Sequence, residues 1–371
     1  MQVSVQKAEL KQYRRVLVTS DIHGHGHLLK RLLQEAAFSP DDALIIVGDM
    51  VEKGPDSLGT LRQVMQLSRQ ENVFPLMGNV DLWRLCLMEE TDAEKLKEVI
   101  RFSKNAEKWW GSSLVGEMTR EMHLDMDENG DLSAFFSAIR KHFKEELDFI
   151  RALPTALETE HFHFVHGGLP HERMDEIAGM NPFSLLKYDD FLASEPAFEK
   201  WMVAGHWPVA LYNADILQHG PVMDEKRRIL AIDGGCGVRG DGQLNLVITD
   251  WEAKQFIHLS ATDREKIRAL DAQAASPVCR NIRWHDPDVE LVEKSEKWAT
   301  VLHHGYRMEI PLHFLQGDEE SGWKCYNLTD YRLPAQPGDV IQLIFEHDGI
   351  AYCKKNDVCG WYEGRYQKIK E

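Results

Sequence analysis

The chain lacks the features that mark membrane-spanning, secreted and nucleic-acid-binding proteins. None of its apolar runs approaches the roughly 18 residues of a membrane-spanning helix, and its first residues contain no apolar core of signal-peptide length. Basic residues are scarce, because 43 Lys and Arg stand against 60 Asp and Glu and give a formal net charge of −17. Phosphate backbones are bound by basic faces. We therefore expect a cytoplasmic protein that binds neither membranes nor nucleic acids.

Closely spaced cysteines are also missing. The six cysteines are irregularly spaced, and no C-x-x-C pair occurs. Structural zinc sites usually contain such pairs, and cytoplasmic thiols stay reduced, so we expect mostly reduced, structural cysteines. Four of them fall in the last hundred residues, which leaves a small zinc site or a disulfide there as the alternative. The length of 371 residues suits two domains better than one.

Short β-branched runs alternate with helical patterns in the first part of the chain. Strands are predicted at residues 16–19, 43–47 and 72–77, and helices at 28–37 and 58–67. This alternation predicts an α/β (α+β) fold with a mainly parallel or mixed sheet flanked by helices. A polar residue follows each strand, at the edge where open α/β sheets bind their ligands.

The pattern changes in the middle of the chain. Residues 82–153 have helical spacing and many charges, which predicts a helical insert. Further strands are predicted at 162–165, 201–204 and 229–232, followed by a hairpin between residues 244 and 259.

A second domain is predicted after a compositional change at residues 271–277. We expect one domain over 14–270 and a small β-rich domain over 277–371, in which short aromatic strands and turn signals predict an all-β barrel, with an SH3-like form as one candidate. The aromatic residues favour a barrel core. A groove that binds a protein partner is the alternative.

Six side chains that can bind metals follow five of the predicted strands. They are Asp21, His23, Asp49, Asn79, His166 and His206. Each alone is as well explained as a turn residue, but as an ordered set at strand ends they predict a metal centre. One carboxylate can bridge two divalent ions about 4 Å apart, which together can clamp the attacking and leaving oxygens of a phosphoryl displacement. Mixed oxygen and imidazole ligands suit manganese, iron and zinc.

Five motifs carry a resemblance to a known family. They are S-D-I-H-G at 20–24, G-D-M-V-E-K-G at 48–54, G-N-V-D at 78–81, H-G-G at 166–168 and G-H-W-P at 205–208. In this order they resemble the signature blocks of calcineurin-like metallophosphoesterases. The second and fourth blocks are most similar to the phosphoprotein phosphatase branch, which includes bacterial serine/threonine phosphatases and diadenosine tetraphosphate hydrolases. The resemblance covers about residues 14–259 and implies a four-layer β-sandwich flanked by helices.

The resemblance implies roles for individual residues. Two divalent ions are implied, manganese first, with iron, zinc and nickel as alternatives. Asp21 and His23 would hold one ion, Asp49 would bridge both, and the second would be held by Asn79, His166 and His206. The implied catalytic residues are Asp49, Lys53 and Asn79. Lys53 and Asn79 would also bind the substrate phosphate, and the ligands would be supported from behind by Glu52, Asp81 and Asp233.

The chain departs from the family pattern at three places. Val80 replaces the histidine that the family uses as a general acid, and that acid's carboxylate partner corresponds to Asp81. Lys53 stands where the branch has a phosphate-binding arginine, so it keeps the charge but loses the bidentate fork. The second phosphate-binding arginine has no convincing match, and Arg173 and Lys187 are the best basic candidates for its place.

Three functions compete at this stage. The first is hydrolysis of phosphomonoesters, on phosphorylated proteins or small molecules, by a hydroxide that bridges the two metals. The second is hydrolysis of diadenosine polyphosphates, which Val80 favours because a phosphoanhydride leaving group needs less acid help. The third is a metal-bound pseudophosphatase scaffold whose β domain recruits a partner, for which Val80 is the one supporting feature. The six intact ligand positions favour an enzyme.

Overall fold

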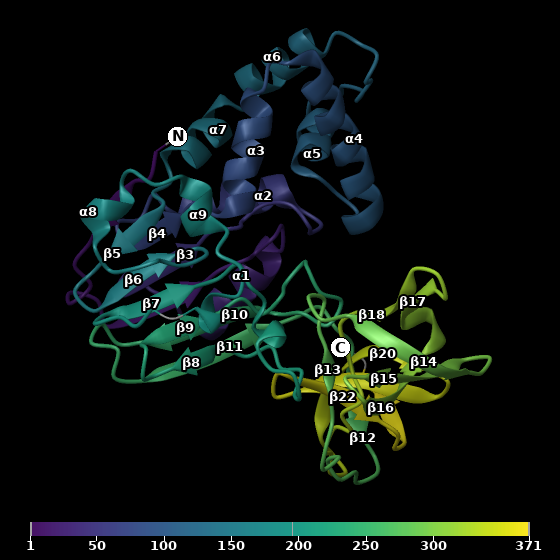
Figure 1. The fold of residues 1–371 in the computed structure, drawn as a ribbon. Helices are drawn as coiled ribbons and strands as arrows, with labels where there is room; N and C mark the ends of the chain where they lie inside the picture. The colour runs from purple at the N-terminus through teal and green to yellow at the C-terminus, as the bar shows by residue number, and fades with distance from the viewer. Residues whose placement is uncertain (1, 195, 370–371) are drawn as a thin grey trace. The chain divides into compact units, whose positions relative to one another are not determined.

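The computed structural model describes residues 2–194 and 196–369, which form two compact units (Figure 1). The first unit contains Met1–Trp207, Pro221–Val238 and Gly242–Ala261. The second contains Pro208–Gly220, Arg239–Asp241 and Thr262–Glu371. Among the described residues, no helix has both the length and the apolar content needed to cross a membrane.

Two mixed sheets form the centre of the first unit. One has the order β11-β10-β2-β3-β4, with β2, β3 and β4 parallel. Its strands are β2 (Arg15–Thr19), β3 (Asp42–Val47), β4 (Val73–Leu76), β10 (Leu244–Thr249) and β11 (Phe256–Ala261). The other has the order β1-β5-β6-β7-β9-β8, with β6, β7 and β9 parallel. Its strands are β1 (Val5–Lys7), β5 (Ala156–Glu158), β6 (Phe162–Val165), β7 (Trp201–Ala204), β8 (Val222–Asp224) and β9 (Ile229–Ala231).

The strands are apolar on both faces because each sheet lies between two layers. In β3, Ile45 points into the core between the sheets, where it packs with Phe164 and Val203 of the other sheet. Its neighbour Ile46 points to the opposite side and packs with the helices. Successive side chains of a strand face opposite ways, so a strand covered on both faces is a continuous apolar run.

Helices cover the outer faces and complete four layers, as predicted. Next to the first sheet lie α1 (Gly26–Glu35) and α2 (Ser57–Leu67), which contact each other. The same apolar cluster continues into α3 (Asn79–Glu89), α4 (Ala93–Trp110), α5 (Leu114–Glu121), α6 (Leu132–His142) and α7 (Lys144–Ala152). The second is covered by α8 (Met174–Ile177) and α9 (Pro182–Leu186). Two short 3-10 helices, η1 (Phe191–Ala193) and η2 (Val209–Leu211), follow.

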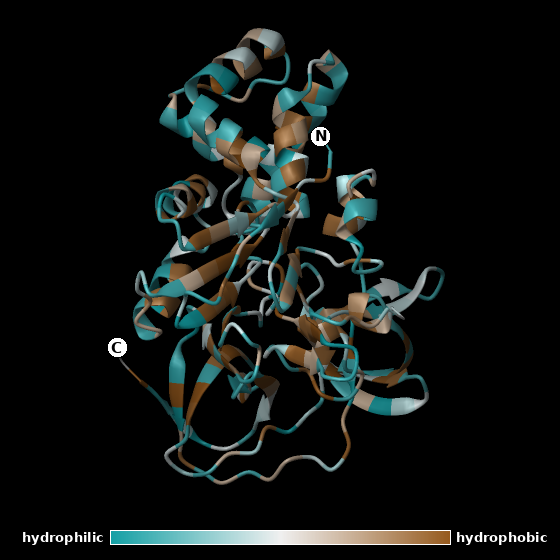
Figure 2. Ribbon diagram, turned by 90° about the vertical axis from the view of Figure 1, so that its left-hand side faces the viewer, coloured by the Kyte–Doolittle hydropathy of each residue, from teal (hydrophilic) through white to brown (hydrophobic). Residues whose placement is uncertain are grey.

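The helical insert consists of α3 to α7, which gather at one end of the first unit (Figure 1). Its helices alternate hydrophobic and hydrophilic residues (Figure 2), as expected of helices that pack on one side and face water on the other. Glu117 of α5 fixes the insert to α2, because its carboxylate accepts hydrogen bonds from the backbone amides of Ser57 and Leu58 at 2.9 and 2.6 Å. Such caps satisfy the amides that a helix start leaves open.

The second unit is built from strands, as predicted. Two five-stranded sheets have the orders β22-β21-β20-β12-β23 and β16-β15-β14-β18-β17, and β13 pairs with β19. The strands are β12 (Lys266–Ala269), β13 (Asn281–Ile282), β14 (Asp288–Lys294), β15 (Trp298–His303), β16 (Tyr306–Pro311), β17 (Leu315–Asp318), β18 (Gly322–Cys325), β19 (Leu328–Thr329), β20 (Val340–His347), β21 (Ile350–Lys355), β22 (Val358–Tyr362) and β23 (Tyr366–Lys368), with the 3-10 helix η3 (Leu312–Phe314) between β16 and β17.

The second unit begins earlier in the chain than the predicted boundary. The predicted first domain runs to residue 270, but β12 pairs with β20 and β23 and so belongs to the second unit. The segment Pro208–Gly220 also belongs to it. Backbone pairing with strands more than 70 residues away fixes β12, and the local composition at 271–277 carries no sign of that pairing.

Candidate active site

The candidate metal ligands follow parallel strands of the two sheets. Asp21 and His23 follow β2, Asp49 follows β3, and Asn79 is the first residue of α3, directly after β4. On the other sheet, His166 follows β6 and His206 follows β7. The carboxyl ends of parallel strands lie at one edge of a sheet, which explains why residues spread over 185 positions meet.

Asp21, His23 and Asp49 form the tightest part of the site. Each offers one potential ligand atom, and these atoms lie within 4.8 Å of one another. The Nε2 atom of His23 is 3.8 Å from Oδ1 of Asp21 and 3.5 Å from Oδ2 of Asp49. Its Nδ1 lies 3.1 Å from the carbonyl of Val51, and that contact directs Nε2 towards the carboxylates.

His166 and Asn79 lie on the other side of Asp49. The Nε2 atom of His166 is 3.0 Å from Oδ1 of Asn79 and 3.4 Å from Oδ1 of Asp49. Its Nδ1 lies 2.7 Å from the carbonyl of Val47. Asp49 therefore stands between the group around His23 and the group around His166, which is the place expected of a bridging ligand.

His206 is next to this second group but has a different partner. Its ring centroid is 5.4 Å from that of His166, and its backbone amide donates to Oδ2 of Asp21 at 3.0 Å. Its Nε2 contacts Oδ1 of Asp189 at 2.7 Å. Sequence reasoning missed Asp189, because an acid in an exposed loop carries no local sign of a contact with a residue 17 positions later.

Several site residues have left-handed backbones. Asp21, His23, Asp49, Lys53 and His206 have φ between 46° and 66°. This region is uncommon for residues other than glycine, and such strain gathers at functional sites. The loops after the strands are thus bent sharply enough to turn side chains of neighbouring strands towards one centre.

Gly78 allows two of these loops to touch. A Cβ atom at this position would lie 2.1 Å from the backbone nitrogen of Asp49 and 2.2 Å from its Oδ1. Any larger residue would push Asp49 out of the centre. The glycine of the third motif is therefore required by close backbone approach.

The charges of the site suit divalent cations. Asp21 and Asp49 are buried, with 2 % of each exposed. Burial, with the charge of Asp49, raises the pKa of Asp21 to about 6. Although burial opposes it, the carboxylates of Asp49 and Asp21 raise the pKa of His166 to about 10. The buried carboxylates repel each other and favour a proton on the imidazole of His166, so the site favours positive charge. Its oxygen and imidazole donors fit hard or borderline metal ions.

Lys53 points into the same centre. Its Nζ is 3.4 Å from Nε2 of His23, and the side chain is half-buried. A flexible cation beside the carboxylate cluster can contact an anionic group that approaches it. The other basic candidates have exposed acidic partners, since Arg173 pairs with Glu176 and Lys187 with Asp189.

The three acids predicted to support the ligands have different contacts. Asp81 accepts hydrogen bonds from the amides of Gly78 and Met50, both at 3.0 Å, and so joins the second and third motifs. Asp233, which follows β9, accepts from the amide of Gly235 at 2.7 Å. The third acid, Glu52, turns away towards the insert.

Glu52 forms a buried ion pair that sequence reasoning missed. Its Oε1 lies 2.7 Å from Nε of Arg84, with 1 and 2 % of the two side chains exposed. The same carboxylate oxygen accepts from the amide of Leu114 at 3.0 Å. The loop of the second motif is thereby joined to two helices of the insert.

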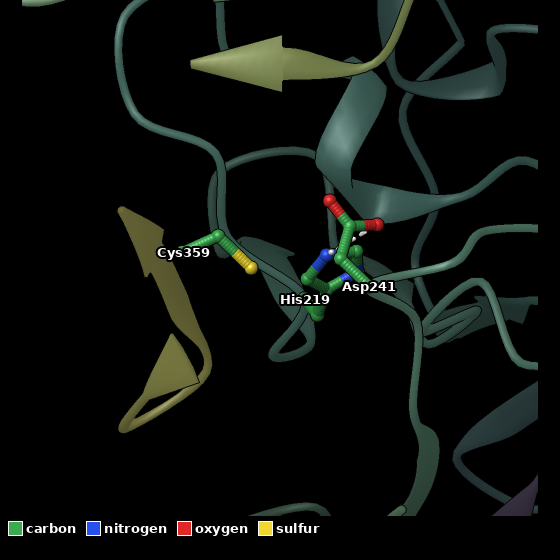
Figure 3. A group of neighbouring side chains, drawn as sticks. All are labelled: His219, Asp241 and Cys359. Atoms are coloured by element: carbon green, nitrogen blue, oxygen red, sulfur yellow. Dashed lines mark ion pairs between the residues drawn. The ribbon is translucent and has the colours of Figure 1, made fainter. Parts of the chain in front are cut away.

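A second cluster of potential metal ligands lies in the second unit (Figure 3). It contains His219, Asp241 and Cys359, all buried. Nε and Nη2 of Arg239 donate hydrogen bonds to the two carboxylate oxygens of Asp241, at 2.8 and 2.9 Å. Burial raises the pKa of Cys359 well above its usual range. A carboxylate already neutralised by arginine beside a protonated thiol is a structural ion-pair cluster, and we assign no metal to it.

Comparisons with known proteins identify the family of the chain. Residues 14–234 match the calcineurin-like phosphoesterase family. A symmetrical bis(5'-nucleosyl)-tetraphosphatase of Erwinia tasmaniensis is 27 % identical over 278 residues, which cover 66 % of this chain and 97 % of that protein. One of the same name from Serratia proteamaculans is 25 % identical over 294 residues, which cover 69 and 98 %.

Among solved structures, a putative diadenosine tetraphosphatase aligns with 70 % of this chain and 99 % of its own, at 19 % identity and a TM-score of 0.42. The family match spans the strands and loops that hold Asp21, Asp49, Asn79, His166 and His206. Since it covers more than half of the chain, the protein belongs to the calcineurin-like phosphoesterase family and is a metal-dependent hydrolase of phosphoric esters.

Proposed function

We propose that the protein hydrolyses the phosphoanhydride bonds of dinucleoside polyphosphates. One observation carries the proposal, which is the nature of residue 80 at the start of α3. Val80 has 4 % of its surface exposed and packs in the core beneath the helices. Its amide still donates to Oδ1 of Asp49 at 2.8 Å, but its side chain has no proton to give to a leaving oxygen.

The leaving group decides how much this matters. A serine alkoxide needs a proton as the ester bond breaks, and general acid help is typically worth about 10²–10⁴-fold in rate. A nucleoside polyphosphate leaves as a stable anion and needs far less help. Asp81, the usual partner of the missing acid, serves here as an acceptor for the amides of Gly78 and Met50.

The residues around the centre have separate tasks in this proposal. When bound, two divalent cations, manganese in our proposal, would activate water and neutralise phosphate charge. Asp21, His23, Asp49, Asn79, His166 and His206 would hold them. Lys53 would contact the phosphate with a flexible point charge, and Asn79 would orient it. The curated relatives, whose names state a symmetrical cleavage of bis-nucleosyl tetraphosphates, support the same substrate class.

The H-G-G motif at 166–168 favours a second candidate, a phosphomonoesterase that acts on phosphorylated proteins or small molecules. The test compares kcat/KM for a dinucleoside tetraphosphate, an aryl phosphate and a phosphoserine peptide, with manganese. We expect the order dinucleoside tetraphosphate, aryl phosphate, phosphoserine peptide, and two nucleoside diphosphates as products of the first. A phosphoserine peptide that is cleaved best would overturn the proposal in favour of the phosphomonoesterase.

Two controls separate this activity from contamination. Asp49→Asn removes the charge of the central carboxylate and should abolish turnover and lower the manganese bound after dialysis. Glu252→Gln removes one charge from an exposed turn and should alter neither. Treatment with a chelator should stop the wild type, and manganese should restore it.

A further inference from the structure

Four aromatic side chains of the insert form a continuous cluster, which we call the aromatic surface. It consists of Trp83 on α3 and of Phe102, Trp109 and Trp110 on α4. The ring centroids of Trp83 and Phe102 are 5.2 Å apart, and Phe102 lies 6.4 Å from Trp109 and 6.2 Å from Trp110. Trp109 and Trp110 are 5.7 Å apart.

Two members of the cluster are open to solvent. Trp83 is 40 % exposed and Trp109 is 63 % exposed. Indole rings bury a large apolar area when they pack, and a gathering of exposed ones marks a contact site for something flat or apolar. A merely structural cluster would place these rings inside the insert, where Leu96 and Ile100 of α4 lie.

Helix geometry connects this surface to the catalytic centre. Asn79 is the first residue of α3, and Trp83 comes four positions later. Residues four apart lie on the same face of a helix, about 6 Å along its axis, which is slightly more than one turn. Helical side chains also lean towards the N-terminus. Trp83 therefore stands next to Asn79 and leans towards the end of α3 that carries it.

Arg84 provides a second connection. Its guanidinium carbon lies 4.5 Å from the ring centroid of Trp83 and 4.3 Å from that of Phe102. The same guanidinium pairs with Glu52 at 2.7 Å, and Glu52 precedes Lys53 in the chain. The side chain of Arg84 thus links these two rings to Glu52, the residue that precedes Lys53 in the chain.

The end of α4 is held near the same loop. The helix ends at Trp110, and the amide of Leu114 donates to the carboxylate of Glu52 at 3.0 Å. Arg84 of α3 and Leu114, the first residue of α5, therefore both contact Glu52, the residue before Lys53. The cluster thus lies on the insert, whose first helix begins at Asn79 and contacts Glu52 through Arg84.

We infer that the aromatic surface binds a nucleobase of the substrate by stacking, while Lys53 and Asn79 hold its phosphates. The inference rests on the proposed function, and it names the part of the substrate that the metal centre does not contact. Nucleobases stack on aromatic side chains and next to arginine planes, and each stack contributes substantially to affinity without selecting one base. The formal charge of −17 argues against a nucleic-acid strand as the ligand and favours a small nucleotide.

The test compares two ligands that differ only in the base. Binding of AMP and of ribose 5-phosphate to the manganese-loaded full chain is measured by equilibrium dialysis. We expect the wild type to bind AMP about 5- to 100-fold more tightly than ribose 5-phosphate. Trp83→Ala should bring this ratio close to one, and Trp83→Phe, which keeps a ring, should restore most of it.

Two further variants separate stacking from loss of fold. Trp109→Ala changes the most exposed ring of the aromatic surface and should lower the ratio without lowering the unfolding temperature. Phe135→Ala removes an aromatic residue of the same insert that lies outside the aromatic surface, next to Phe136, and should leave the ratio unchanged. An equal change with Phe135→Ala would contradict the inference.

The experiments distinguish failure of the nucleobase site from failure of the proposed function. Equal affinities of the wild type for AMP and ribose 5-phosphate would overturn the inference even if dinucleoside tetraphosphate is the best substrate. Tight, Trp83-dependent binding of AMP together with preferential cleavage of a phosphoserine peptide would uphold the nucleobase site and overturn the proposed function.

Discussion

The backbone amide of Val80 donates a hydrogen bond to Oδ1 of Asp49 at 2.8 Å, so residue 80 supports the central carboxylate through its main chain. A side chain can be changed here without removing that contact. We predict that Val80→His raises kcat/KM for a phosphoserine peptide by about 10²-fold or more, because a proton donor is restored. The value for a dinucleoside tetraphosphate should change little.

Val80→Ala is the matched control. It also disturbs the packing of the buried valine but supplies no proton, so it should not raise activity on either substrate. A comparable gain from both variants, or a gain from Val80→His on both substrates, would show that residue 80 acts through packing alone.

Substitutions of Lys53 test how the protein binds the phosphate. We predict that Lys53→Met weakens competitive inhibition by inorganic phosphate about 10- to 100-fold, because a hydrogen bond to a charged group is lost. Lys53→Arg should tighten it, since a guanidinium can form two parallel bonds to phosphate. The inhibition constants are measured with an aryl phosphate at constant ionic strength. Lys226→Met, which changes an exposed lysine, should behave as the wild type.

Asp42 predicts a specific pH dependence of stability. Although burial alone would raise its pKa, hydrogen bonds from Arg15 and Arg14 lower the pKa to about 2. Because the folded pKa is lowered, the stabilisation is present above the unfolded pKa near 4 and is lost as the pH falls towards 2. We allow for solvent screening, since Arg14 is 60 % exposed. The contribution at pH 7 is then about 1–2 kcal/mol.

Urea unfolding at pH 7 and near pH 2.5 measures this effect. Asp42→Asn should be less stable than the wild type at pH 7, and the difference should shrink at the lower pH. Asp125→Asn, which changes an exposed acid of the insert, should show no such convergence. A difference between Asp42→Asn and the wild type that stays constant between the two pH values would mean that the carboxylate contributes through shape rather than charge.

The sequence predicts the strands and the residues after them better than it predicts what the charged residues contact. Residues such as Asp49 and His166 directly follow apolar runs, and that pattern is local and visible. Arg84 is the single charged residue in the apolar stretch 82–88 of a helical segment, and nothing in the local sequence identifies its partner. Only the fold shows that Arg84 is buried and pairs with Glu52, which lies 32 positions earlier in the chain. Asp189 beside His206 escaped notice for the same reason.

The buried pair between Glu52 and Arg84 allows a double-mutant cycle. Burial raises the pKa of Glu52 and lowers that of Arg84, so each charge depends on the other. We predict that Arg84→Met lowers the free energy of unfolding by about 3–5 kcal/mol, because a buried carboxylate is left unpaired. Glu52→Gln combined with Arg84→Met should cost less than Arg84→Met alone, since no buried charge then remains.

Urea unfolding of the four proteins of the cycle gives the coupling energy. Arg101→Met, which breaks an exposed ion pair with Glu128 on the same helical insert, is the control and should change stability little. The rings of Trp83 and Phe102 also lose their cation in Arg84→Met. AMP binding to this variant should therefore weaken relative to ribose 5-phosphate. The double variant should lose less free energy of unfolding than the two single variants together. If it loses as much, the two side chains do not act as a pair, and the proposed link between the aromatic surface and the Lys53 loop is refuted.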